Sequence, residues 1–128
     1  MDGKKNLLAY VTASNYKSRI PALAIRCEPG TTSLLFDGGR VLEDTGDGSS
    51  VLLRIKYDDA PPRRVFGSPS TNYHGAFIRT PAWHIRSLLK AKRALVEFTP
   101  FQQAPIIAEF DVSGLDQHLP LLKKHCRL

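Results

Sequence analysis

The sequence predicts a single α+β domain over residues 1–128, in which two helices cover a strongly bent antiparallel sheet or small β-sandwich of about seven strands. Three observations lead to this prediction. The chain has 128 residues, enough for one hydrophobic core and too few for two. Apolar and polar residues alternate in several short runs, as they do in half-buried strands. Two later segments, after Pro81 and after Ser113, carry apolar residues at helical spacing.

The first half of the chain contains the first four predicted strands. These are Leu7–Ala13, Leu23–Cys27, Thr32–Asp37 and Val51–Asp58. The turn residues Glu28-Pro29-Gly30 separate the second run from the third, so these two runs are predicted to form an antiparallel hairpin. A polar, glycine-rich connection precedes the fourth run, whose alternation is the clearest in this half.

The middle of the chain is predicted to be irregular before it enters a helix. Prolines and turn residues interrupt residues 60–75, where only Val65-Phe66 is β-prone, and a short strand is predicted at Ala76–Ile78. Thr80 is predicted to cap the first helix, with Pro81 in its first turn. The side chains of this helix that are predicted to face the sheet are Ala82, Ile85, Leu88 and Leu89.

The stretch from Arg93 to Leu115 predicts a second hairpin. Residues 93–98 and 106–112 both alternate with a period of two. The tip between them, 99–105, contains two prolines, which withhold donors from any ladder. The hairpin is therefore expected to end in a stiffened loop.

The hairpin is predicted to lead directly into the last helix. Ser113 is a candidate N-cap, and Asp116 would complete a capping box with it. Leu115, Leu119 and Leu122 are the expected buried residues. Pro120 lacks an amide hydrogen, so we expect a kink or a break into two short turns there.

Composition and charge narrow the function only slightly. The chain is 42% hydrophobic and 23% charged, and no apolar run approaches the length of a membrane span. The net charge of +6 is compatible with acidic partners. The best basic patch for nucleic acid is Arg79, Arg86, Lys90, Lys92 and Arg93. We favour reading it as the solvated face of a helix. Trp83 is either a core anchor or an exposed binding residue, and we favour the core.

No cofactor, metal or catalytic site emerges from the residue pattern. His74, His84, His118 and His125 are scattered and lack the spacing of a zinc site. Gly38-Gly39 lacks the lysine of a phosphate loop, and no nucleophile elbow is present. We therefore expect no enzyme, although a site assembled from residues remote in sequence stays open as a third interpretation.

The two cysteines, Cys27 and Cys126, allow two interpretations. A bridge between them would close nearly the whole chain into a loop, which the chain-entropy model credits with about 4 to 5 kcal/mol. In a cytosolic protein, two separate buried thiols are the simpler alternative.

Several short motifs together carry a family resemblance. They are Pro21–Cys27, Val51–Arg54, Phe66-x-Ser68, Ala76-Phe77, the helix after Pro81, Thr99-Pro100-Phe101, Phe110–Leu115 and Cys126. In this order the chain resembles the VasI/TagO accessory proteins associated with type VI secretion. The sequence departs from that pattern in having Phe66 where the family has tryptophan, in lacking a leader peptide, and in its segment before Pro21.

The resemblance implies a small, non-enzymatic accessory or interaction module of the bacterial envelope, with Cys27 and Cys126 bridged and with a protein partner. It implies a periplasmic location, and without it the expected location is cytoplasmic. The tip residues Pro100, Phe101 and Gln102 have no evident role in the core, so we take them as the candidate partner-contacting surface. The alternative function is nucleic-acid binding through the basic patch from Arg79 to Arg93.

Overall fold

The computed structural model describes residues 7–18, 20–28 and 31–126 and is built on one antiparallel sheet. The sheet has eight strands in the order β1-β2-β3-β6-β5-β4-β7-β8. The strands are β1 (Leu7–Thr12), β2 (Ala22–Glu28), β3 (Thr31–Asp37), β4 (Val51–Tyr57), β5 (Arg63–Pro69), β6 (Gly75–Ile78), β7 (Arg93–Phe98) and β8 (Ile106–Asp111). Both predicted hairpins are present, as β2 with β3 and as β7 with β8. The predicted turn residues Pro29 and Gly30 lie outside the described residues.

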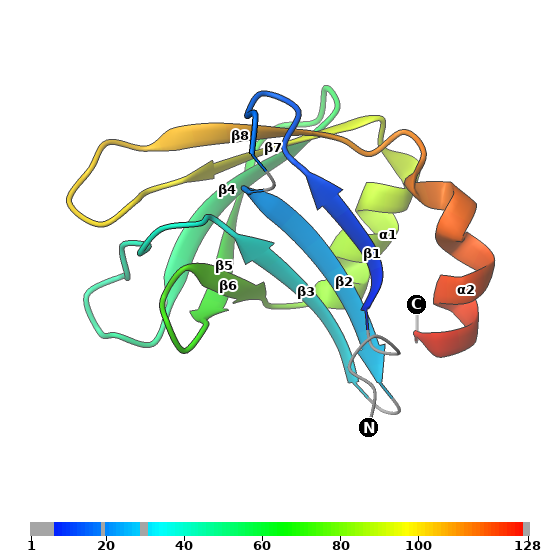
Figure 1. The fold of residues 1–128 in the computed structure, drawn as a ribbon, viewed down its shortest axis with the longest axis horizontal. Helices are drawn as coiled ribbons and strands as arrows, with labels where there is room; N and C mark the ends of the chain where they lie inside the picture. Colours follow the sequence, from blue (N-terminus) through cyan, green and yellow to red (C-terminus); the bar gives the residue numbers. More distant parts are fainter. Residues whose placement is uncertain (1–6, 19, 29–30, 127–128) are drawn as a thin grey trace.

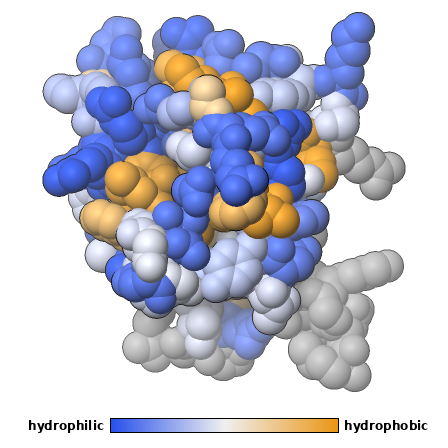
Figure 2. Space-filling model, turned by 90° about the vertical axis from the view of Figure 1, so that its left-hand side faces the viewer, coloured by the Kyte–Doolittle hydropathy of each residue, from blue (hydrophilic) through white to orange (hydrophobic). Residues whose placement is uncertain are grey.

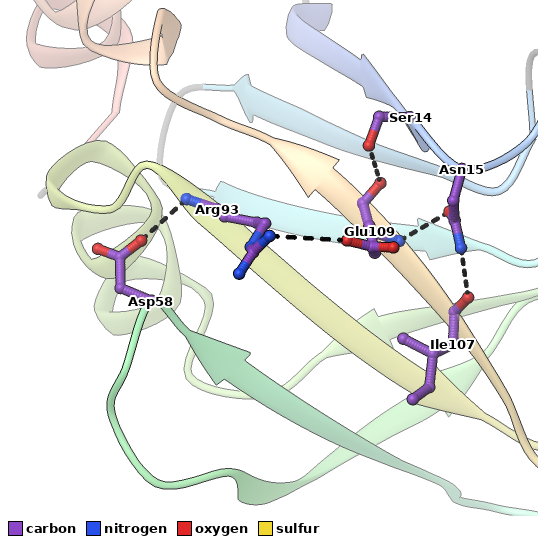
Figure 3. Close-up of polar contacts among 6 residues, drawn as sticks. All are labelled: Ser14, Asn15, Asp58, Arg93, Ile107 and Glu109. Carbon is purple, nitrogen blue, oxygen red and sulfur yellow. Dashed lines mark hydrogen bonds and ion pairs between the residues drawn. The ribbon is translucent and has the colours of Figure 1, made fainter.

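The sheet curls until its two edge strands, β1 and β8, nearly meet. The residues just after β1 make the connection (Figure 3). The backbone N–H of Ser14 donates to the carbonyl of Glu109 at 2.7 Å. The side-chain amide of Asn15 donates to the carbonyl of Ile107 at 3.0 Å and accepts the N–H of Glu109 at 2.9 Å. The predicted bent antiparallel sheet is thus confirmed, and the bend produces a nearly closed barrel.

The strand that the sequence analysis largely missed is β5. It was expected to be irregular around Val65-Phe66, but all seven residues of Arg63–Pro69 form a strand. Gly67 explains part of this difference, because a Cβ added there would lie 2.8 Å from the Cβ of Ala76 on β6. The glycine that suggested a turn instead lets two strands approach closely.

Alternation along the strands fills the barrel with apolar side chains. The ring of Phe36 lies with its centroid 4.9 Å from that of Phe98 and 6.5 Å from that of Phe110. These three rings are buried completely or almost completely. Phe98 and Phe110 belong to the runs 93–98 and 106–112, and their burial agrees with the predicted period of two, whereas no buried face was predicted for the run that contains Phe36.

The first helix, α1 (Pro81–Lys90), forms where it was predicted, but it begins differently. Ile85 and Leu88 are buried as expected. Thr80 has a left-handed backbone with φ of 53°, and its hydroxyl donates to the carbonyl of Arg79 rather than capping the helix. The cap prediction is therefore wrong, and Pro81, with its fixed φ, marks the start of the helix.

The predicted break in the last helix is confirmed. A short 3-10 helix, η2 (Leu115–His118), is followed by α2 (Leu119–His125), with Pro120 in the first turn of α2, where its missing N–H costs no hydrogen bond. The predicted capping box does not form. The Ser113 hydroxyl instead donates to the Asp111 carboxylate at 2.6 Å, which closes the turn after β8.

Cys27 and Cys126 form a disulfide, with their Cα atoms 5.3 Å apart. The bridge joins β2 to the residue after α2, and both cysteines are buried. Of the two interpretations of the cysteines, the bridged pair is the one found. Figure 1 shows the result, with α2 at the right-hand end of the barrel and α1 near it, opposite the loop tips. No helix among the described residues is long and apolar enough to cross a membrane.

Candidate functional site

Three loops meet at the end of the barrel away from the helices, at the left of Figure 1. We call this surface the loop end, and it consists of residues 38–50, 70–74 and 99–105. Loop 38–50 joins the other two. Its Leu42 N–H donates to the carbonyl of Tyr73 and its Glu43 N–H donates to the carbonyl of Thr99, each at 2.8 Å. The loop end is therefore one hydrogen-bonded unit rather than three separate loops.

The tip predicted to contact a partner is held firmly on this surface. Phe101 N–H donates to the carbonyl of Val41 at 2.8 Å, and Gln102 N–H donates to the Glu43 carboxylate at 3.2 Å. Pro100 is buried and pairs with Leu42 in an isolated bridge. Of the three predicted residues, Pro100 thus supports the tip from beneath, while Phe101 and Gln102 face the solvent.

Phe101 leaves 50% of its surface exposed, and Val41, whose carbonyl accepts its N–H, leaves 45% exposed. The sequence analysis missed Val41, because nothing in the glycine-rich connection shows which tip it will meet. Figure 2, which looks onto this side of the molecule, shows orange apolar patches between hydrophilic side chains. The loop end thus presents apolar side chains on a backbone that is already ordered.

The residues of the predicted basic patch lie before, on and after α1. Arg79 lies before α1 and donates to the Ser50 hydroxyl at 2.9 Å, whereas Arg93 lies after α1 and pairs with Glu109 at 3.9 Å. The remaining members, Arg86, Lys90 and Lys92, are exposed. The ten residues of α1 separate the two arginines, by about 15 Å along the helix axis.

A cluster of aromatic rings lies beside α1. Trp83, predicted to be in the core, is 39% exposed, so that prediction is wrong. Its ring makes edge contacts with Tyr57 and His84, at centroid distances of 6.2 and 4.9 Å. The guanidinium of Arg63 lies 4.4 Å from the centre of the indole ring, a distance typical of a cation–π contact.

Tyr57 and His84 form a hydrogen bond of 2.6 Å between the phenol oxygen and Nδ1. Burial, aided by the charge of Arg63, lowers the pKa of His84 to about 4, so the ring is neutral at pH 7. Burial also raises the pKa of Tyr57 above its usual value. Both pKa values move away from pH 7, which favours a structural hydrogen bond over an acid–base pair.

The carboxylates of the loops stabilise turns. Asp44 accepts the N–H of Gly46 at 2.7 Å, and Asp47 accepts that of Ser49 at 2.9 Å. Asp58 accepts the N–H groups of both Lys92 and Arg93 at 3.0 Å. Within residues 7–18, 20–28 and 31–126, no group of three or more His, Cys, Asp or Glu side chains lies close enough to hold a metal ion.

Comparisons with protein-family models, curated proteins and solved structures returned no match to this chain. The loop end and the cluster around Trp83 are therefore the two candidate sites, and each is defined by its geometry alone.

Proposed function

We propose that this protein is a non-enzymatic accessory module of the bacterial envelope that binds another protein through the loop end. The resemblance to VasI/TagO proteins suggests the envelope location and the accessory role. The observation that carries the proposal is the half-exposed Phe101 on a loop whose backbone is hydrogen-bonded to its neighbour at Val41. A large ring presented in this way has little structural use where it lies.

The loop end has the physical properties that favour binding. Aromatic side chains supply much of the energy at protein interfaces. Loops that are ordered before binding lose less conformational entropy when the complex forms. The bonds from Phe101 to Val41 and from Gln102 to Glu43 supply that order. Val41, whose carbonyl accepts the Phe101 N–H, is a second exposed apolar residue on this surface.

The disulfide supports the envelope location. Bridges persist in oxidising compartments such as the periplasm and are rare in the reducing cytosol. The Cys27–Cys126 bridge closes a loop of 99 positions and fastens α2 to the barrel. A protein with this bridge is better suited to the periplasm than to the cytosol.

Site-specific photo-crosslinking in cells tests the proposal. A photoreactive phenylalanine analogue at position 101 should give one dominant crosslink to another envelope protein. Leu121, which lies on α2 and is 43% exposed, is the matched control and should give no such crosslink. Identical crosslinks from both positions, or none from position 101, would argue against the loop end.

A pair of substitutions separates binding from stability. Phe101→Ser should weaken the identified complex, whereas Leu121→Ser should not. Both variants should unfold within about 0.5 kcal/mol of the wild type, because both side chains are substantially exposed. If Phe101→Ser unfolds the protein instead, the ring serves the fold and the proposal fails.

A further inference from the structure

A hollow lies beside the Trp83 cluster, between the β4–β5 turn and α1. We call it the Trp83 groove, with a volume of about 560 Å³ and a lining that includes Tyr57, Pro61, Pro62, Arg63, Trp83 and Lys90. Its size falls within the range of small-molecule sites, about 300 to 1,000 Å³. Its walls are mainly rings and aliphatic surface, so it can desolvate an apolar body.

Two cations line this apolar groove without an acidic partner. In the described part of the chain, the ion pairs join Arg54 to Glu97 and Arg93 to Glu109, and neither involves Arg63 or Lys90. The one carboxylate of the lining, Asp58, has its Oδ1 directed at two backbone N–H groups. An anionic group in the groove would therefore meet two positive charges without an ion-pair partner and the single negative charge of Asp58.

The aromatic wall is already arranged. Contacts with Tyr57 and His84 hold the Trp83 ring at interplanar angles of 67° and 82°. The Tyr57–His84 hydrogen bond fixes the rings behind it. A ligand that stacks on this wall would lose little of its binding energy to ordering the protein.

We propose that the Trp83 groove binds a small aromatic anion, with its rings against Trp83 and Tyr57 and its oxyanion between Arg63 and Lys90. The charge distribution favours this ligand over a nucleic-acid strand. A strand would require a row of cations to follow its phosphates, whereas the lining of the groove holds two, Arg63 and Lys90. The site is separate from the loop end, because the groove and the loop end adjoin opposite ends of β4.

The experiment uses two dyes that differ in charge. The probe is 1-anilino-8-naphthalenesulfonate, and its neutral counterpart is N-phenyl-1-naphthylamine. Trp83 is the only tryptophan, so its indole N–H gives a single NMR cross-peak that reports locally on the groove. We expect the anionic dye to move this peak saturably, with half-saturation below about 100 µM from typical ligand efficiency. The neutral dye should bind at least about tenfold more weakly, which corresponds to about 1.4 kcal/mol.

Matched substitutions on the protein locate the charge. Arg63→Gln and Lys90→Gln should each weaken binding of the anionic dye by about five- to tenfold, as expected for loss of a charge-assisted contact. Arg86→Gln removes an equal charge from α1 one helical turn before Lys90, at an exposed position that does not line the groove, and should leave binding within about twofold. Near-UV circular dichroism checks that each variant remains folded.

Several results would overturn the proposal. These are equal affinity for the two dyes, equal losses in the Arg63 and Arg86 variants, or an indole peak that does not move. Displacement of the anionic dye by a thymidine oligonucleotide at about 50 mM salt would also overturn it, in favour of a nucleic-acid surface. Unchanged dye affinity in the Lys90 variant would remove Lys90 from the site and contradict the two-cation arrangement.

Discussion

Replacing His84 by asparagine should remove a component of the acid sensitivity of this protein. His84 is 5% exposed and shares a hydrogen bond of 2.6 Å with the hydroxyl of Tyr57. Its pKa falls from 6.5 to about 4 on folding, because burial and Arg63 disfavour the charged ring. The folded pKa lies below the unfolded value, so the unfolded chain binds the proton first. The folded state gains stability from keeping His84 neutral. This contribution is fully present above pH 6.5 and is lost as the pH falls toward 4.

The magnitude follows from the size of the pKa shift. The full shift corresponds to about 3 kcal/mol, of which about 2 kcal/mol is expressed by pH 5. Water at the adjoining groove screens part of the Arg63 effect, so we expect about 1 to 2 kcal/mol between pH 7.5 and pH 5. The asparagine side chain can both donate and accept hydrogen bonds, so it can keep one to the Tyr57 hydroxyl, and it does not titrate in this range.

The assay is urea unfolding of the wild type and His84→Asn at pH 7.5, 6.0 and 5.0. The remaining histidines and carboxylates are common to both proteins, so the difference between the two pH profiles isolates His84. The wild type should lose about 1 to 2 kcal/mol more than the variant over this range. Parallel profiles would refute the reasoning, because they would mean that the ring titrates equally in the folded and unfolded states.

Three further predictions concern the fold. Cys126→Ser should lower the free energy of unfolding by about 2 to 5 kcal/mol; two reactive thiols in the denatured, unreduced wild type would contradict the bridge. Asn15→Ala should cost about 1 to 2 kcal/mol and speed amide exchange at Glu109, whose N–H it leaves unpaired; unchanged exchange would mean that the barrel seam does not depend on Asn15. Gly67→Ala should lower the free energy of unfolding by about 1 to 3 kcal/mol, because the new Cβ crowds β6. Gly114→Ala is the control and should be nearly neutral, because no atom lies within 4 Å of its new Cβ. Similar thermal shifts in the two variants would exclude the close-approach explanation.

Local patterns predicted the elements of this fold well. The alternation in 93–98 and 106–112 correctly placed the buried face of β7 and β8, because a period of two is a property of the strand alone. Pro120 correctly predicted the interruption between η2 and α2, since a missing amide hydrogen acts within one helical turn. These inferences needed no knowledge of what each segment packs against.

The failures occur where a local signal had a second structural use. Gly67 resembled a turn residue but permits strand contact, and Thr80 resembled a cap but occupies a left-handed bend. The closure of the barrel depends on Asn15, whose amide takes the place of a strand residue beside β8. Nothing in the sequence near Asn15 identifies Ile107 and Glu109 as its partners, because that pairing arises only when the sheet has curled.

The Trp83 groove illustrates the same limit at the level of function. Tyr57 and Arg63 continue the inward alternation that the structure shows in β4 and β5, and for Arg63 this direction was not predictable because β5 was expected to be irregular. At this end of the two strands that direction leads to α1, where Tyr57 meets His84 and Arg63 meets Trp83. The site combines side chains from two strands with side chains from a helix. The residue pattern of each element predicts which way its own side chains face, but not where the other element lies.

The separation of the groove from the loop end makes the two proposals independent. The seven residues of β4 lie between them, a span of about 20 Å. Phe101→Ser should therefore leave dye binding unchanged, and Arg63→Gln should leave the crosslink at position 101 unchanged. A change in either cross-test would mean that the two ends communicate through the barrel. Since Phe98 at one end and Ala94 at the other belong to the same strand β7, that strand would be the first element to examine.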